Sequence, residues 1–309
     1  MSPSFISSGF FNRLTCCSRI IGWLLALAAL SLLQACSAVK LAYNNAPELG
    51  YWWLDGYADF DDSQSLKVRA ELARLQLWHR TDELPKIADM LQEARRLAGA
   101  DLGPAPVCAL YAEARARFSA VTAQAERAAV ELAMSLGPEQ LAHIERKFAR
   151  KNADWRDEWL VIPASQRLEH RLKTNVERSE DFYGRLEERQ LAALRAGLET
   201  SIFDPQLVYA ERVRRQQDLL QTLRLASGAG PGVVRKPGPA EVLTALRAYF
   251  DRSLNSPNPA YRAYNERLVA ESCAVFAQVH NSTTPEQRSR AVRRLAAYER
   301  DVVELSGQR

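Results

Sequence analysis

The sequence of 309 residues contains little glycine, proline, cysteine and histidine: 14 Gly, 14 Pro, 5 Cys and 4 His. So few glycines and prolines argue against a β-rich or loop-rich protein of this length. The few cysteines and histidines leave little material for a metal cluster or a dense disulfide framework. Lys and Arg number 41 against 37 Asp and Glu, a net charge of +4. A dedicated nucleic-acid binder would show a strong basic excess, so no nucleic-acid partner is expected.

Sequence motifs for catalysis and cofactor binding are missing as well. The chain has no Gly-rich phosphate loop, no Gly-x-Ser-x-Gly elbow and no His-x-x-x-His pair. Residues 59–63 begin like a calcium loop, but Gln64 and Ala70 stand where that loop needs Gly and Glu. These acidic residues are better placed at the start of the next helix, where negative charge is favourable. We therefore expect a non-enzymatic protein with no metal and no cofactor.

The first 35 residues have the organisation of an export signal. Arg13 and Arg19 precede an apolar run at residues 20–33, with no acidic residue before it. As a helix this run is about 21 Å long, short for a bilayer core of about 30 Å. Residues 33–36 (LQAC) resemble the bacterial lipobox, which implies cleavage before Cys36 and attachment of diacylglycerol to its thiol.

The same resemblance implies a location. Ser37, rather than Asp, follows the cysteine that would carry lipid, which favours the outer membrane, facing the periplasm, over the inner membrane. The chain would then contact a membrane through its N-terminal lipid. The alternative is a simple secretory signal or an uncleaved anchor followed by cysteine by chance.

Two cysteines remain in the mature chain besides the lipidated one, namely Cys108 and Cys273. Exported proteins fold where disulfides form and persist, so we expect this pair to be bonded. By chain entropy, closing so long a loop stabilises the fold by about 5 kcal/mol. Two buried free thiols are the alternative.

The rest of the chain predicts helices, because apolar residues recur at helical spacing and strand patterns are nearly absent. Several segments begin with proline, which is tolerated in the first helical turn. The fold class is therefore all-α, with about ten helices in antiparallel hairpins forming an elongated bundle or solenoid-like body. The expected segments are residues 66–77, 87–97, 104–135, 138–159, 163–183, 186–199, 205–223, 241–253, 259–280 and 285–305.

This pattern sets the expected domain organisation. Residues 1–35 form the signal peptide and residues 36–62 an aromatic-rich tether. Residues 63–309 form the helical domain, interrupted by a flexible Gly/Pro-rich loop at 226–239.

A short pattern recurs at the starts of expected helices. Residues 136–140 (LGPEQ) and 283–287 (TTPEQ) share Pro-Glu-Gln, and residues 186–190 (LEERQ) keep the Leu and the Gln. In the copy with Thr284 it predicts a capping box. The pattern is similar to the Leu-Thr-x-x-Gln motif of small periplasmic helical stress chaperones, although any well-capped helix start would also produce it.

Aromatic side chains gather just after the predicted lipid site, at Tyr51, Trp52, Trp53 and Tyr57. They could lie at the level of lipid headgroups, or clasp this segment onto the helical body. We favour the clasp, because the neighbouring small and acidic residues suggest a specific turn.

Basic side chains gather at Arg146, Lys147, Arg150 and Lys151, where i,i+4 spacing aligns them in pairs on a helix. A solvated helix face is the simplest interpretation. The alternative is a patch that meets anionic lipid headgroups or an acidic partner.

Several stretches resemble one family, the proteobacterial lipoproteins grouped as domain of unknown function 6279. They are residues 39–46 (VKLAYNNA), 51–57 (YWWLDGY), 78–79, 83–85 and 145–148, with Asn152 and Trp155. The resemblance implies an all-helical, lipid-anchored periplasmic protein and supplies no activity.

The expected function is therefore that of an envelope lipoprotein acting as a non-enzymatic binding or structural module, with an unidentified protein or envelope partner. One alternative is a lipid-anchored chaperone or envelope-stress adaptor. A second is an envelope hydrolase.

Overall fold

The computed structural model describes residues 38–230 and 235–308, and within these ranges it contains helices and no strands. The all-α prediction is confirmed. The predicted signal peptide and Cys36 lie outside the described residues. The chain divides into two units, and the second begins at Ala46. Of the first unit, residues 38–44 are helical.

The second unit contains twelve α-helices and one π-helical turn among its described residues. In chain order they are α2 (Ala46–Ala58), α3 (Asp62–Trp78), η1 (His79–Glu83), α4 (Leu84–Leu97), α5 (Pro104–Gln124), α6 (Glu126–Ser135), α7 (Pro138–Trp159), α8 (Ala164–Tyr183), α9 (Glu188–Glu199), α10 (Pro205–Ser227), α11 (Pro239–Leu254), α12 (Pro259–Asn281) and α13 (Pro285–Gly307). The predicted tether at 36–62 thus includes α2, which belongs to the same unit as the later helices. The Gly/Pro-rich stretch between α10 and α11 includes residues 231–234, which lie outside the description.

Most expected helix boundaries agree with the structure to within a few residues, and proline occupies the first turn of α5, α7 and each of α10 to α13. The exception is the single helix expected at 104–135. It breaks at Ala125, which ends α5 and starts α6. No Gly or Pro marks this break in the sequence. Packing accounts for it, because α5 lies against α12 whereas α6 lies against α11.

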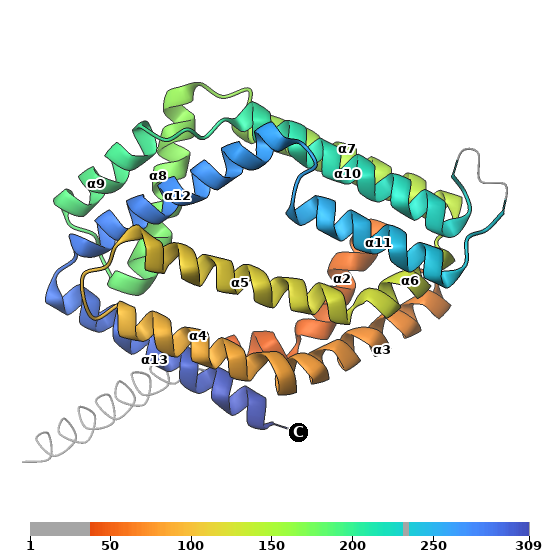
Figure 1. Cartoon of the computed structure of the whole chain (residues 1–309), viewed down its shortest axis with the longest axis horizontal. Coiled ribbons are helices and arrows are strands. Elements are labelled where there is room, and N and C mark those ends of the chain that lie inside the picture. The colour runs from red at the N-terminus through yellow and green to blue at the C-terminus, as the bar shows by residue number, and fades with distance from the viewer. Residues whose placement is uncertain (1–37, 231–234, 309) are drawn as a thin grey trace, which may run out of the picture. The chain divides into compact units, whose positions relative to one another are not determined.

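The helices of the second unit form two similar halves, α2–α7 and α8–α13. Within the halves α2 contacts α7 and α3 contacts α6, just as α8 contacts α13 and α9 contacts α12. Between the halves α4 lies beside α13 and α5 beside α12, matched by α10 beside α7 and α11 beside α6 (Figure 1). Two halves that are related by an approximate two-fold axis make reciprocal contacts of this kind. The fold therefore contains an internal structural repeat.

A covalent bond joins the halves at one of these reciprocal contacts. Cys108 of α5 and Cys273 of α12 form a disulfide with a Cα–Cα distance of 5.6 Å. Cys273 lies fourteen positions before Gln287, and Glu126 lies fourteen positions before Gln140. At the matching contact between α6 and α11, Glu126 forms an ion pair with Arg247 at 2.6 Å. Cys273 and Glu126 thus hold equivalent positions, but the contacts that they make between the halves are closed by different chemistry.

Candidate functional site

Four helices start with the same hydrogen-bonded turn. In each, a glutamine at the third helical position accepts a hydrogen bond through Oε1 from the backbone N–H of the N-cap residue, at 2.8 to 3.1 Å. The glutamines are Gln64 of α3, Gln140 of α7, Gln190 of α9 and Gln287 of α13. Three of them belong to the repeated sequence pattern. The fourth, Gln64, follows the acidic run whose Asp61 caps α3.

These glutamines meet in pairs, one pair in each half. In the first half the Nε2 of Gln140 donates to the Oε1 of Gln64 at 2.7 Å, and the Nε2 of Gln64 lies 3.2 Å from the Oε1 of Gln140. Each Nε2 also donates to a backbone carbonyl two residues before the partner's N-cap, that of Ser135 or Asp59. Both amide groups are fully hydrogen-bonded, and the two helix starts are locked together.

The second half repeats this arrangement bond for bond. Gln190 and Gln287 exchange hydrogen bonds at 2.6 and 3.0 Å, and their Nε2 atoms also donate to the carbonyls of Ser282 and Arg185. Gln190 is completely buried. The sequence pattern therefore marks a tertiary contact as well as a helix cap.

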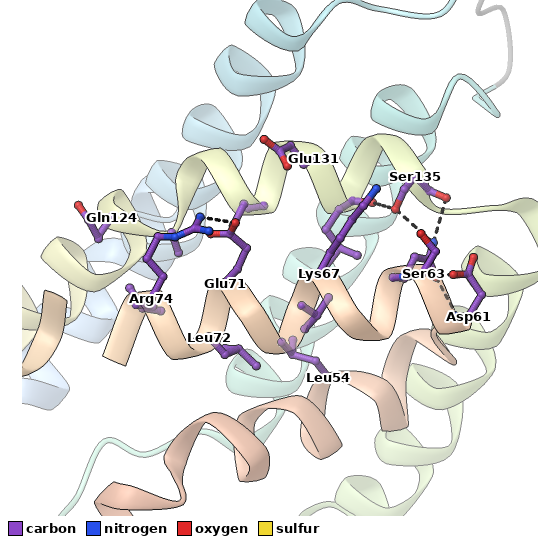
Figure 2. Close-up of a pocket in the computed structure, with 17 residues that line it drawn as sticks. Leu54, Asp61, Ser63, Lys67, Glu71, Leu72, Arg74, Gln124, Glu131 and Ser135 are labelled. Atoms are coloured by element: carbon purple, nitrogen blue, oxygen red, sulfur yellow. Dashed lines mark hydrogen bonds and ion pairs between the residues drawn. The ribbon is translucent and has the colours of Figure 1, made fainter. Parts of the chain in front are cut away.

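A pocket of about 390 Å³ opens between α3 and α6 (Figure 2), and Gln64 of the first glutamine pair is among the residues that line it. Its walls are apolar, and its rim carries charges of both signs. The wall residues are Leu54, Val68, Leu72, Leu75, Ala125, Ala128, Ala129 and Leu132. The rim includes Lys67, Glu71, Arg74 and Glu131, and Arg74 forms an ion pair with Glu71.

A smaller pocket of about 170 Å³ occupies the matching place between α8, α9 and α12. Counted from the paired glutamines, Val275 and Phe276 stand where the first half has Ala128 and Ala129. Val275 packs so tightly on α9 that a Cβ at Gly197 would lie 2.6 Å from its Cγ2. On α12, Val275 therefore fills space against α9, whereas Ala128 leaves the matching space between α3 and α6 open.

The pocket was not predicted from the sequence. Its wall residues recur at helical spacing like those of any buried face, so hydropathy gives no sign that this face is open. The one available signal is the run of small residues at Ala125, Ala128 and Ala129, which is also typical of close helix packing.

The predicted aromatic residues separate into two groups. Tyr51 is buried, with its hydroxyl 2.9 Å from the Oγ of Ser65, and Tyr57 is half-buried. Trp52 and Trp53 are 63% and 64% exposed. One face of α2 thus packs onto the helical body while the other carries both tryptophans on the surface.

The predicted basic residues all lie on α7 and do not line the pocket. Arg146, Arg150 and Lys151 are exposed, whereas Lys147 is half-buried and lies over the ring of Tyr57. Lys151 also forms an ion pair with Asp154 at 3.2 Å.

The second half buries a histidine that the first half lacks. His280 donates from Nε2 to the carbonyl of Ala100 at 2.8 Å, so its Nδ1 accepts from the Tyr183 hydroxyl at 2.9 Å. Burial lowers the pKa of His280 and keeps the ring neutral, and the nearby Arg288 adds to this effect. Burial also raises the pKa of Tyr183 to about 12. This pair is a satisfied structural contact between α8, α12 and the end of α4.

A buried carboxylate holds α10 to the end of α11. Burial by itself would raise the pKa of Glu211, but hydrogen bonds from Arg214, Arg215 and Ser256 outweigh this and hold the pKa below its usual range. Across residues 38–230 and 235–308, no group of three His, Cys, Asp or Glu side chains could hold a metal ion. In the same ranges no helix is long and apolar enough to cross a membrane.

Comparison with known proteins identifies the family. Residues 56–231, more than half of the chain, match the family of unknown function DUF6279. The chain belongs to DUF6279. The match runs from α2 to the residues after α10 and so includes every residue that lines the pocket except Leu54, together with three of the four paired glutamines. No curated protein and no solved structure matches this DUF6279 chain.

Proposed function

We propose that this protein is a non-enzymatic binding module, anchored by lipid at Cys36 to the outer membrane and facing the periplasm. Its α3–α6 pocket would take apolar side chains of a polypeptide partner. The observation that carries the proposal is the difference between the halves, since the pocket is about 390 Å³ in the first half and only about 170 Å³ in the second.

The surroundings of the pocket favour a polypeptide over a purely apolar small molecule. Lys67, Glu71 and Glu131 place both signs of charge around apolar walls. An amphipathic helix lying in a groove presents apolar anchors flanked by polar side chains, which fits such a rim. The Gln64–Gln140 pair holds the N-terminal ends of α3 and α7 together, so the pocket between α3 and α6 is already formed before a partner binds. A preformed pocket reduces the entropy cost of binding.

Filling the pocket tests this function. Ala128→Phe places an aromatic ring in the space that Val275 and Phe276 occupy in the second half. We expect binding of a fluorescent apolar probe, anilinonaphthalene sulfonate, and of a labelled amphipathic helical peptide to weaken by about tenfold or more. Ala263→Phe, at an exposed position of α12, is the matched control and should leave both affinities unchanged. Equal binding by the Ala128→Phe variant would contradict the proposal.

The lipid anchor is tested separately. Cys36→Ala removes the thiol that would be acylated, so we expect the variant to lose incorporation of labelled palmitate. Palmitate labelling that Cys36→Ala leaves unchanged would exclude lipidation at Cys36 without affecting the pocket assay.

The alternative of a lipid-anchored chaperone is supported by the motif that resembles Leu-Thr-x-x-Gln and forms a glutamine pair in each half. A chaperone should suppress aggregation of reduced α-lactalbumin at equimolar ratio, and Ala128→Phe should reduce this effect. Binding of the helical peptide without aggregation suppression would favour the dedicated binding module.

A further inference from the structure

We propose that the outer face of α2, together with the neighbouring basic residues of α7, contacts the anionic headgroup layer of the membrane. This inference rests on the anchored location proposed above, but it concerns a different surface from the pocket.

The outer face of α2 is apolar and aromatic. Leu49, Trp52 and Trp53 are 50%, 63% and 64% exposed. Their spacing of three and four residues places them on one side of the helix. Tryptophan is enriched where membrane meets water, because its ring is largely apolar but carries one N–H donor.

The inner face of α2 fixes the direction in which these side chains point. The Arg69 guanidinium stacks over the ring of Tyr51 at 3.6 Å, and Arg69 also pairs with Glu48 of α2. Ala58 at the end of the helix belongs to a core cluster with Leu141 and Ile144 of α7. Because these contacts already hold the inner face of α2 against the helical body, Trp52 and Trp53 stay on the surface without any change in the fold.

Aromatic and basic residues that are distant in the sequence meet at this surface. Trp53 contacts Tyr57 with ring centroids 5.1 Å apart, and Tyr57 contacts Phe148 of α7 at 5.8 Å. The Nζ of Lys147 lies 5.6 Å from the centre of the Tyr57 ring. Arg150 follows one helical turn after Lys147 on α7 and is exposed. The exposed tryptophans of α2 therefore lie next to the cationic side chains of α7 on the same surface.

Nearby acidic side chains are largely engaged elsewhere. Glu48 pairs with Arg69, Glu145 pairs with Arg224, and Asp55 accepts a hydrogen bond from the backbone N–H of Phe60. Arg146 and Arg150 make no ion pair among the described residues. This leaves positive charge available for anionic headgroups.

The position of α2 in the chain favours a bilayer as the occupant of this surface. Ala46 starts the helix ten residues after Cys36. A lipid on Cys36 would hold this segment within reach of the headgroups. A second, weaker contact beside a lipid anchor then orients the protein on the membrane.

Vesicle binding by the unlipidated mature chain, carrying Cys36→Ala, tests the inference. We expect co-sedimentation with vesicles of phosphatidylcholine containing a quarter phosphatidylglycerol, and weaker binding to phosphatidylcholine alone. The double variant Trp52→Ser/Trp53→Ser should lose about tenfold or more in affinity. Arg146→Gln/Arg150→Gln should remove most of the preference for anionic vesicles. Phe118→Ser, a 58% exposed position on α5, is the control and should bind normally.

The contrary outcomes are distinct. No binding by the unlipidated chain, or equal binding by the tryptophan variant with an unchanged circular dichroism spectrum, would overturn the inference. Self-association of the wild type that the tryptophan variant abolishes would do so too, because the surface would then be an interface between copies. Unchanged palmitate labelling of the Cys36→Ala variant in cells would count against the proposed lipid anchor alone.

Discussion

The two halves of the molecule share helix order, reciprocal contacts and paired glutamines, yet they differ in how well they are filled. The second half buries Gln190, His280 and Tyr183 and places Val275 against Gly197. The first half keeps alanines on α6 and leaves a pocket of about 390 Å³. The comparison separates what the repeated fold needs from what only one half has. The glutamine pairs belong to the fold, whereas the open pocket is specific to the first half.

The largest expected difference between the halves is in how much their two reciprocal contacts contribute to the free energy of unfolding. Replacing both Cys108 and Cys273 with Ala should lower the free energy of unfolding by about 3–5 kcal/mol, because the disulfide closes a long loop. Arg247→Ala, at the matching contact, should lower it by about 1 kcal/mol or less, since Arg247 is largely exposed. Urea unfolding of both variants measures the difference, and similar losses would contradict it.

The second-largest expected difference is in how much each glutamine pair contributes to the free energy of unfolding. Gln190→Ala removes the hydrogen bonds that Gln190 exchanges with buried Gln287 and the one that it donates to the Ser282 carbonyl, so we expect a loss of about 3 kcal/mol. Gln64→Ala should cost about 1–2 kcal/mol, because water in the adjacent pocket can replace the lost hydrogen bonds. Urea unfolding again provides the measurement. A larger loss for Gln64→Ala would show that the first half depends more on its pair.

A smaller loss of stability is expected where α9 and α12 pack closely in the second half. Gly197→Ala should lower stability by about 1–2 kcal/mol although alanine favours helix, because its Cβ would meet the stiff Val275 side chain. Adding Val275→Ala removes this clash, so Gly197→Ala should then no longer destabilise the chain. Thermal unfolding of the single and double variants checks this, and a stabilising single variant would disprove the steric argument.

The smallest effect is the pH dependence that His280 of the second half contributes. Because the pKa of His280 is lowered in the folded state, the unfolded chain takes up a proton that the folded chain resists. The stability that neutral His280 contributes is present above about pH 6.5 and is lost as the pH falls toward its folded-state value. Comparing unfolding free energies at neutral and mildly acidic pH should give a shallower slope for His280→Gln, and an unchanged slope would rule this group out.

Much of the fold could be predicted from the sequence, because its signals are local. Helical periodicity, prolines in the first turn and cap residues such as Asp204 and Thr284 act within a few residues. The prediction of an all-α protein is confirmed for this reason. The break at Ala125 could not be predicted, since no local signal ends α5 and only the packing of α5 and α6 against different helices separates them.

The candidate site shows the same division. The helix-start pattern was visible in three copies, but its pairing was not, because the paired glutamines are 76 and 97 residues apart. The aromatic and basic clusters are both apparent in the sequence, but their meeting at Tyr57 and Lys147 depends on how α2 packs against α7.

The sequence by itself determined the helices and their caps, because hydrogen bonds within one turn and an apolar stripe along one helix need no distant partner. Only the tertiary structure decided which glutamines pair, which tryptophans stay exposed and which half keeps a pocket. Those features depend on side-chain volume at contacts between helices far apart in the chain. Alanine in one half and Val275 with Phe276 in the other leave the helices alike and change the space between them.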